Sequence, residues 1–189
     1  MRVLGLNGSP RRGGNTELLL AEVMKGAESQ GAETKTLVLN KLKITPCQHC
    51  DACFEAGVCR IKDDMPTVYK EMEKADRIVL ASPIHFLGLT AQMKAMIDRG
   101  QALWARKYIL KKPPLGDKRP RKGLFIAVGA MKLARLFEPS LATVKAFFTV
   151  IDVGYAGELL FPGIDEKGAI KNHPTALKEA FAAGQKLVE

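Results

Sequence analysis

Short apolar runs alternate with longer stretches of helical spacing along the whole chain. The apolar runs predict five strands, which cover residues 3–6, 34–39, 77–81, 124–128 and 155–161. Between them, apolar residues recur every three or four positions, which predicts helices at residues 15–30, 65–74, 90–106 and 140–151 and from about 174 onward. Asn15 and Thr16 are both candidates for the N-cap of the first helix, and Gly31 marks its end.

A regular alternation of strands and helices predicts an α/β fold, in which a parallel sheet carries helices on both faces. We expect the five strands to take the flavodoxin-like, doubly wound order 2-1-3-4-5. In such sheets, ligands bind beyond the carboxyl ends of the strands, where the strand order reverses. Three loops are therefore expected at one edge of the sheet, and they are Gly8–Asn15, Ser82–Leu89 and Gly129–Phe137.

Length and composition fit one soluble domain. At 189 residues the chain can bury a full core, so we expect a single domain over residues 1–189. Hydrophobic residues make up 47% of the chain and charged residues 26%, and no apolar run approaches the roughly 20 residues of a membrane span. The first residues lack the features of a secretory signal. We therefore expect a cytoplasmic protein without a membrane partner.

The net charge of +9 is concentrated in one segment. Between residues 106 and 122, which we call the basic segment, eight Lys or Arg residues accompany a single Asp. Proline and glycine are frequent there, which predicts a connecting loop rather than a helix that binds nucleic acid. Tyr108 is its only aromatic residue, so the interleaved aromatics of a nucleic-acid site are missing. We expect no nucleic-acid partner.

The first of the three loops combines glycines, small polar side chains and arginines with the start of a helix. Backbone N–H groups at a helix N-terminus attract an anion, and glycines let the backbone approach it closely. We therefore expect a phosphate site to which Ser9, Asn15 and Thr16 add donors. The loop matches neither the NTPase P-loop nor the dinucleotide G-x-G-x-x-G motif. An ordinary glycine-rich turn remains the alternative interpretation.

The second loop, around residues 81–88, is apolar and partly aromatic. A turn of this kind at the same sheet edge suits a flat ring whose rim meets backbone groups. The alternative is a loop that packs into the core. His85 alone gives no evidence for a ligand, because an isolated histidine in a loop is usually solvated or capped.

The only four cysteines of the chain lie within thirteen residues. Cys47, Cys50, Cys53 and Cys59 have the spacing C-x2-C-x2-C-x5-C, which is close to the compact ferredoxin pattern that binds a 4Fe-4S cluster. Gly57 would let the chain turn so that Cys59 reaches the fourth iron. Disulfides seldom persist in the cytoplasm, and structural zinc usually uses two separated pairs of ligands. A zinc site and empty thiols stay open as alternatives.

These motifs together resemble the iron-sulfur flavoproteins, which lie within the broader NADPH-dependent FMN reductase group. The resemblance covers most of the first hundred residues in order. The matching motifs are Gly8–Arg11 with Asn15 and Thr16, Pro46–Cys53 with Cys59, Asp63–Met65, Ser82–Ile84, Thr90–Lys94 and Ile97–Arg99. The ordered cysteines separate this branch from relatives that lack a cluster.

The resemblance implies an FMN in the three loops and a 4Fe-4S cluster on the four cysteines. It assigns the phosphate to Ser9, Arg11, Asn15 and Thr16, the ring to Pro83, Ile84, His85 and Phe86, and the closing contacts to Gly129, Ala130 and Met131. Two positions depart from the family pattern, because His85 replaces another aromatic and Met131 replaces a small or hydroxyl residue. The resemblance also implies a homodimer or homotetramer in which the cluster of one subunit lies near the flavin of its neighbour.

A flavin exchanges one or two electrons, whereas a cluster passes one, so a protein with both couples two-electron to one-electron partners. We expect an electron-transfer flavoprotein that joins a ferredoxin-like carrier to a small-molecule acceptor, without a catalytic side chain. The basic segment is either a docking surface for an acidic carrier or a solvated loop. A cluster-free NAD(P)H-dependent FMN or quinone reductase is the main alternative function. A zinc-knuckle module that binds nucleic acid is another.

Overall fold

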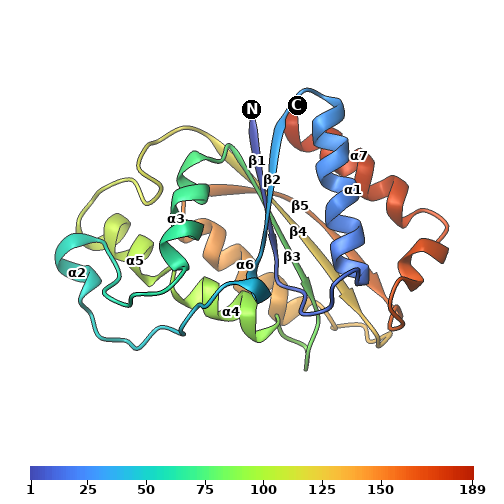
Figure 1. The fold of residues 1–189 in the computed structure, drawn as a ribbon, viewed down its shortest axis with the longest axis horizontal. Helices are drawn as coiled ribbons and strands as arrows, with labels where there is room; N and C mark the ends of the chain where they lie inside the picture. Colours follow the sequence, from blue (N-terminus) through green and yellow to red (C-terminus); the bar gives the residue numbers. More distant parts are fainter.

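Five parallel strands form one sheet in the order β2-β1-β3-β4-β5 (Figure 1) in a computed structural model that describes residues 1–189. The strands are β1 (Arg2–Asn7), β2 (Glu33–Val38), β3 (Arg77–Pro83), β4 (Arg121–Gly129) and β5 (Val153–Pro162). The predicted fold class and strand order are confirmed. The reversal of strand order falls between β1 and β3, so a ligand is expected at the carboxyl ends of these two strands.

Helices cover both faces of the sheet, as predicted (Figure 1). One face carries α1 (Asn15–Ser29) and α7 (Ala176–Val188), and the other carries α3 (Met65–Lys74), α4 (Ala91–Asp98), α5 (Gln101–Trp104) and α6 (Glu138–Val150). The remaining short turns are η1 (Leu39–Lys41), α2 (Cys53–Ala56), η2 (Ala105–Ile109) and η3 (Ala169–Asn172). None of the helices is long and apolar enough to span a membrane.

The central strands are buried on both faces, which explains why their sequences are continuously apolar. In β3, Ile78 and Leu80 contribute to the core under α3 to α6, whereas Val79 and Ala81 contribute to the core under α1 and α7. Side chains of a strand point alternately to the two faces, so one apolar run supplies both cores. This arrangement fixes the ends of β1 and β3, from which the predicted ligand loops start.

Helices α1 and α7 meet backbone to backbone at two glycines. A Cβ added at Gly26 would lie 2.0 Å from the carbonyl oxygen of Phe181, and one added at Gly184 would lie 2.0 Å from that of Val23. Any side chain larger than hydrogen would therefore push the two helices apart. This contact holds the C-terminal helix against the helix that follows the first ligand loop.

The helix predicted over residues 90–106 is wrong as a continuous element. It is divided into α4, α5 and the π-helical turn η2. The hydroxyl of Tyr69 donates a hydrogen bond of 2.5 Å to the carbonyl oxygen of Arg99, and the N–H of Leu103 bonds Gly100 rather than Arg99. Gly100 also lies so close to Phe147 that a Cβ there would be 2.9 Å from its ring. These tertiary contacts override the helical pattern.

The basic segment is only partly the connecting loop that its prolines and glycines predict. It begins within the helical turn η2 and ends within β4, so residues 110–120 form the loop. Arg121 is 4% exposed and donates hydrogen bonds to the carbonyl oxygens of Ala75, Glu73 and Leu115. The charge of this residue is thus used inside the fold and is not available to a partner.

Candidate functional sites

A cavity of about 240 Å³ lies at the carboxyl edge of the sheet, where the strand order reverses. Residues from four loops line it, and they are Ser9, Pro10, Arg11, Gly14, Asn15, Thr16, Pro83, Ile84, His85, Val128, Ala130, Ile164 and Asp165. We call it the sheet-edge pocket. It contains eight of the eleven residues expected to bind a cofactor, whereas Phe86, Gly129 and Met131 lie outside its lining.

The first wall of the sheet-edge pocket is the turn between β1 and α1. The N–H of Ser9 donates to the side-chain oxygen of Asn7 at 2.9 Å, and the N–H of Gly14 donates to the carbonyl oxygen of Arg11 at 3.2 Å. The turn therefore curls back on itself and presents the first turn of α1. N–H groups at that position have no partner within the helix, so they suit an anion.

The predicted N-cap of α1 is wrong. The capping position is Gly14, which has no side chain to cap with, and Asn15 is the first helical residue. The side chain of Asn15 instead donates to the carbonyl oxygen of Glu166 at 2.9 Å and accepts from the N–H of Ile170 at 3.2 Å. Its amide thus fastens the loop after β5 to the first wall.

The loop after β5 forms a wall that sequence analysis missed. Ile164 and Asp165 line the pocket, and Arg11 donates a hydrogen bond of 3.3 Å to the carbonyl oxygen of Asp165. Gly129 and Met131 hold this wall in place through backbone hydrogen bonds. The carbonyl oxygen of Gly129 accepts from the N–H of Ile164, and that of Met131 accepts from the N–H of Gly163. No local pattern signals this wall, since its contacts join residues about 150 positions apart.

The turn between β3 and α4 supplies the apolar wall. Pro83, Ile84 and His85 line the pocket, and the backbones of His85 and Gly88 exchange two hydrogen bonds of 2.9 Å. At the tip, Phe86 and Leu87 have positive φ angles of 49° and 64°, and Phe86 is fully exposed. The ring of Phe86 therefore projects from the rim instead of lining the pocket.

The four cysteines line a second, separate pocket, which we call the cysteine pocket. Its lining also includes Arg60, Arg99 and Gln101. All four thiols are free, yet no three of them are close enough together to form a ready metal site. Cys53 is buried beside the carbonyl oxygen of Gln101, while Cys50 is exposed. Burial raises the pKa of the Cys53 thiol, and the neighbouring cysteines add to this effect.

The backbone between the cysteines is tightly curled. His49 and Asp51 have φ angles of 48° and 54°, and Gly57, with φ of 68°, ends the short helix α2 as the sequence predicted for a turn. Such left-handed residues turn the chain sharply, and all four cysteines line one pocket although their thiols are not gathered at a single point. The donor set of four thiols on a curled segment fits an iron-sulfur cluster better than a disulfide.

Hydrogen bonds to the carboxylate of Asp63 hold the two ends of the cysteine segment together. The carboxylate of Asp63 accepts from the N–H groups of Thr45 and Met65 at 2.9 and 3.0 Å, and from the guanidinium of Arg99 at 2.6 Å. Burial alone would raise the pKa of this carboxyl, but the hydrogen bonds from Arg99 and the backbone hold it below its ordinary value. Asp63 is therefore ionised and paired at neutral pH.

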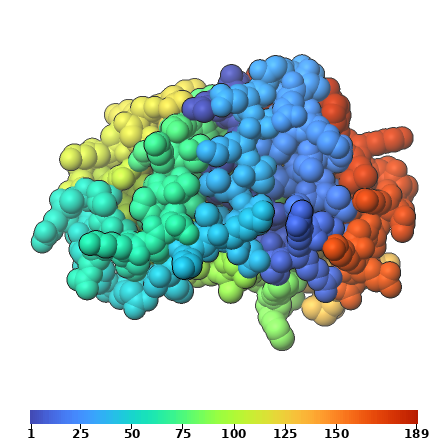
Figure 2. Space-filling view, in the orientation of Figure 1, coloured from blue at the N-terminus to red at the C-terminus, as the bar shows by residue number.

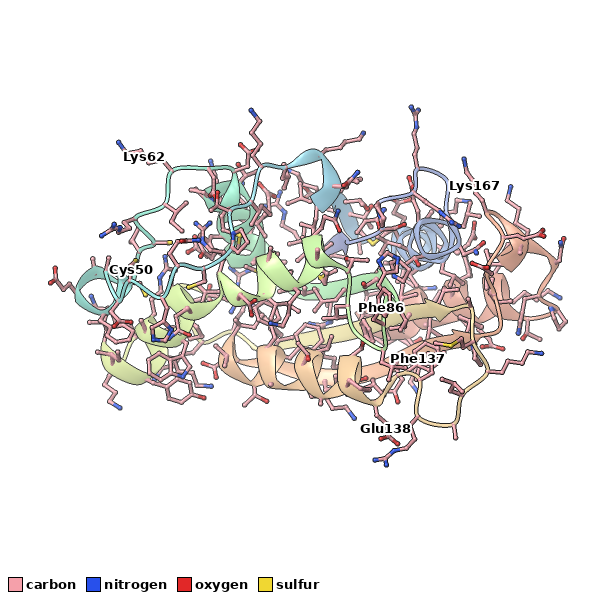
Figure 3. All side chains as sticks on the ribbon, turned by 90° about the horizontal axis from the view of Figure 1, so that it is seen from below. Cys50, Lys62, Phe86, Phe137, Glu138 and Lys167 are labelled. Atoms are coloured by element: carbon pink, nitrogen blue, oxygen red, sulfur yellow. The ribbon has the colours of Figure 1, made fainter.

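The two pockets share no lining residue. Figure 2 shows the residues near position 55 at one end of the molecule and the dark blue first loop well away from them. Figure 3 likewise separates Cys50, at the tip of the cysteine segment, from Phe86 at the rim of the sheet-edge pocket. The two sites are thus built independently within one chain.

The chain is similar to known proteins over most of its length. The family model for NADPH-dependent FMN reductase matches residues 1–134. An iron-sulfur flavoprotein of Archaeoglobus fulgidus is 42% identical over 131 residues, which are 69% of this chain and 63% of the relative. An iron-sulfur flavoprotein of Methanocaldococcus jannaschii is 33% identical over 151 residues, which are 79% of this chain and 72% of the relative.

A solved structure shares the fold over its whole length. The NAD(P)H:quinone oxidoreductase from Methanothermobacter marburgensis has a TM-score of 0.72 at 15% identity, and the match covers 100% of this chain and 96% of the other. The matched regions span between 53% and 63% of the first three curated relatives. The likeness at low identity supports the fold, while the relatives with higher identity carry the family assignment.

Proposed function

The chain belongs to the iron-sulfur flavoproteins of the NADPH-dependent FMN reductase family, and from this premise we propose that it is a flavin-dependent electron-transfer oxidoreductase. It would hold FMN in the sheet-edge pocket and a 4Fe-4S cluster on Cys47, Cys50, Cys53 and Cys59. The observation that supports the proposal is that one chain of this family has two separate pockets, one at the sheet edge and one lined by all four cysteines. When bound, the two groups would supply two-electron and one-electron redox chemistry.

The sheet-edge pocket fits a flavin nucleotide at both ends. The curled first loop and the start of α1 suit the phosphate, with Ser9, Arg11 and Thr16 as side-chain donors. Pro83, Ile84 and His85 offer an apolar surface for the ring, and Ala130 lies on the facing wall. Gly129 and Met131 would act indirectly, because they hold the loop that carries Asp165.

The separation of the two sites supports a homodimer or homotetramer. Within one chain the cysteine pocket and the sheet-edge pocket have no residue in common. Large apolar side chains at the rim of the sheet-edge pocket, Phe86, Leu87 and Met131, are exposed, as expected of a surface that a second subunit covers. We propose that assembly brings the cluster of one subunit near the flavin of another.

A ferredoxin-like carrier is the proposed one-electron partner, and a small molecule at the flavin is the proposed acceptor. Lys111, Lys112 and Lys118 of the basic segment form no ion pair in the structure. They line a surface hollow together with three further basic residues, two prolines and two aspartates, which are Lys107, Arg119, Arg121, Pro113, Pro120, Asp117 and Asp152. An acidic carrier would be attracted to this surface, because complementary charge speeds encounter.

The proposal is tested by purification without air and by analysis of the bound groups. We expect one FMN per chain and about four irons and four sulfides, as a cluster held by four thiolates requires. Stopped-flow mixing with a reduced ferredoxin should then reduce both centres. A yellow protein without iron would instead favour a cluster-free NAD(P)H-dependent reductase, and protein without flavin or iron would contradict the proposal altogether.

A further inference from the structure

The cysteine segment is a loop closed at its base by a short ladder of hydrogen bonds. The N–H of Lys43 donates to the carboxylate of Asp64 at 2.8 Å, and the N–H of Asp64 returns a bond of 3.0 Å to the carbonyl oxygen of Lys43. Two residues further in, the N–H of Thr45 donates to Asp63. We call these four residues the neck. They bring together the residues that precede Cys47 and follow Cys59.

Arg99, from a different part of the chain, bonds both sides of the neck. It lies at the end of α4, is 1% exposed, and donates 2.8 Å to the carbonyl oxygen of Thr45 and 2.6 Å to the carboxylate of Asp63. One guanidinium thus binds both sides of the loop base at once. Nη1 makes both of these bonds, and Nη2 adds one of 3.3 Å to the other carboxylate oxygen of Asp63, which gives a two-pronged pairing that the ammonium of lysine does not reproduce.

One donor of this guanidinium is unused. The Nε of Arg99 is buried without a hydrogen-bond partner, and it is one of only two such side-chain atoms in the protein. A buried charged donor without a partner is energetically unfavourable, so the Nε–H of Arg99 would be stabilised by a hydrogen-bond acceptor. Arg99 also lines the cysteine pocket together with all four cysteines, so their sulfurs are among the acceptors that this pocket offers. If the Arg99–Asp63 ion pair served only to stabilise the fold, Arg99 would not need to line the cysteine pocket or to keep an unpaired Nε–H.

The charge of Arg99 is permanent in this environment. Burial works to lower the pKa of its guanidinium, but the hydrogen bond to the carboxylate of Asp63 raises it above its ordinary value. Asp63 pairs with this cation, but of the two residues only Arg99 lines the cysteine pocket. A fixed cation therefore lies beside thiols that carry negative charge when they ligate a metal.

We propose that Arg99 is a positioning residue of the cysteine site, which closes the loop base before the cluster binds and donates its Nε–H to a sulfur once the cluster is present. The inference rests on the proposed function, since it assumes the cluster. Hydrogen bonds to sulfur and nearby positive charge stabilise the reduced, more negative cluster. Arg99 thereby raises the reduction potential of the cluster as well as ordering its ligands.

The test compares Arg99→Lys with Arg121→Lys. The first variant keeps the charge but removes the Nε–H and the fork, while the second makes the same change at a buried arginine that bonds only backbone carbonyls and one carboxylate away from the cysteines. In redox titrations of the full holoprotein followed by electron paramagnetic resonance, Arg99→Lys should shift the ratio of reduced to oxidised cluster about tenfold, or about 59 mV for one electron, toward the oxidised form. Arg121→Lys should not.

Amide hydrogen exchange of the cluster-free protein provides the second measurement. Exchange at Thr45 and Met65 should be faster in Arg99→Lys than in the wild type and in Arg121→Lys, because the neck opens. Asp63→Asn, which keeps the Nε–H, serves as a second variant if Arg99→Lys does not fold. In this variant, hydrogen exchange at the same two amides should be faster, while the ratio of reduced to oxidised cluster should change by less than tenfold.

The inference is overturned if Arg99→Lys keeps the wild-type potential and exchange, or if Arg121→Lys shifts the potential equally. Should the wild type prove to contain flavin but no iron, the proposed function fails by itself. The exchange measurement then decides the positioning role alone: faster exchange in the variants supports it, and unchanged exchange removes it.

Discussion

The sheet-edge pocket and the cysteine pocket are built in opposite ways. The walls of the first are turns that follow β1, β3, β4 and β5, so the sheet fixes where each wall begins. The second is carried by a loop whose only regular element is the single helical turn α2, and which is fastened at its neck. A ligand can enter a cavity that the sheet already forms, whereas a metal must gather ligands that the loop leaves apart.

This difference predicts that each site can be lost without the other. Cys53→Ala removes the most buried ligand of the cysteine pocket and has the largest expected effect. Iron and sulfide should fall to background, while FMN content should stay at the wild-type level. Metal and flavin analysis of the same preparation measures both. Loss of FMN together with iron would contradict the independence of the sites.

Disrupting the hydrogen bonds of the neck should have the next largest effect, which is a loss in the free energy of unfolding. Asp63→Asn leaves Arg99 buried without its anion, and removal of one partner of a buried pair typically costs about 3 kcal/mol or more. We expect a loss of this size in urea unfolding of the cluster-free protein, without a change in FMN affinity. An equivalent control is Asp98→Asn, because the ion pair of Asp98 with Lys94 is exposed and contributes little.

The same carboxyl predicts a dependence of neck stability on pH. The folded pKa of Asp63 lies below its ordinary value of 3.8, so its contribution is present at neutral pH and is lost as pH falls below that value. Amide exchange at the neck, corrected for intrinsic rates, should therefore be protected at pH 6 and lose protection toward pH 3. In Asp63→Asn this loss of protection with acid should disappear.

In the sheet-edge pocket, Arg11→Ala removes the charged donor nearest the proposed phosphate. Hydrogen bonds to charged groups contribute about 1.5 to 3 kcal/mol, which corresponds to a weakening of FMN binding by roughly tenfold to a hundredfold. Titration of the flavin-free protein measures it. Arg12→Ala is the matched control, since Arg12 is exposed and outside the pocket. Iron content should be unchanged in both variants.

The smallest effect is expected for the basic segment. Reversing charge at Lys111 and Lys118 should slow reduction by an acidic carrier several-fold at low salt, because electrostatic steering contributes to the encounter rate. Stopped-flow rates should converge with those of the wild type at high salt. A rate that does not depend on salt in either protein would leave the basic segment as a solvated loop.

The strands, and the loop that follows the first of them, could be predicted from the sequence. Continuous apolar runs such as Ile78–Ala81 indicate strands buried on both faces, and the glycines and small polar residues after β1 mark a loop at the functional edge. The bounds of α3 were predicted to the residue, because its apolar spacing begins at Met65 and ends before the next strand. These signals are local, so they can be recognised without a structure.

What could not be predicted depends on contacts between distant residues. Asn15 was expected as a candidate cap of α1, but the capping position is Gly14, and the side chain of Asn15 bonds a loop that lies beyond β5. The helix breaks at Gly100 because the hydroxyl of Tyr69 bonds the carbonyl oxygen of Arg99. The hydrogen bonds of Arg99 to Thr45 and Asp63 likewise join three separate segments. Periodicity reports which residues face the core and does not report which polar groups meet there.

The meeting of α1 and α7 at Gly26 and Gly184 has a consequence for this lineage of proteins. The two glycines are neighbours in space although almost the whole chain separates them, and neither position tolerates a methyl group while the helices keep their spacing. Homologues that preserve this contact should therefore retain glycine at both positions. A natural sequence with a bulky residue at one of them should also have a displaced terminal helix.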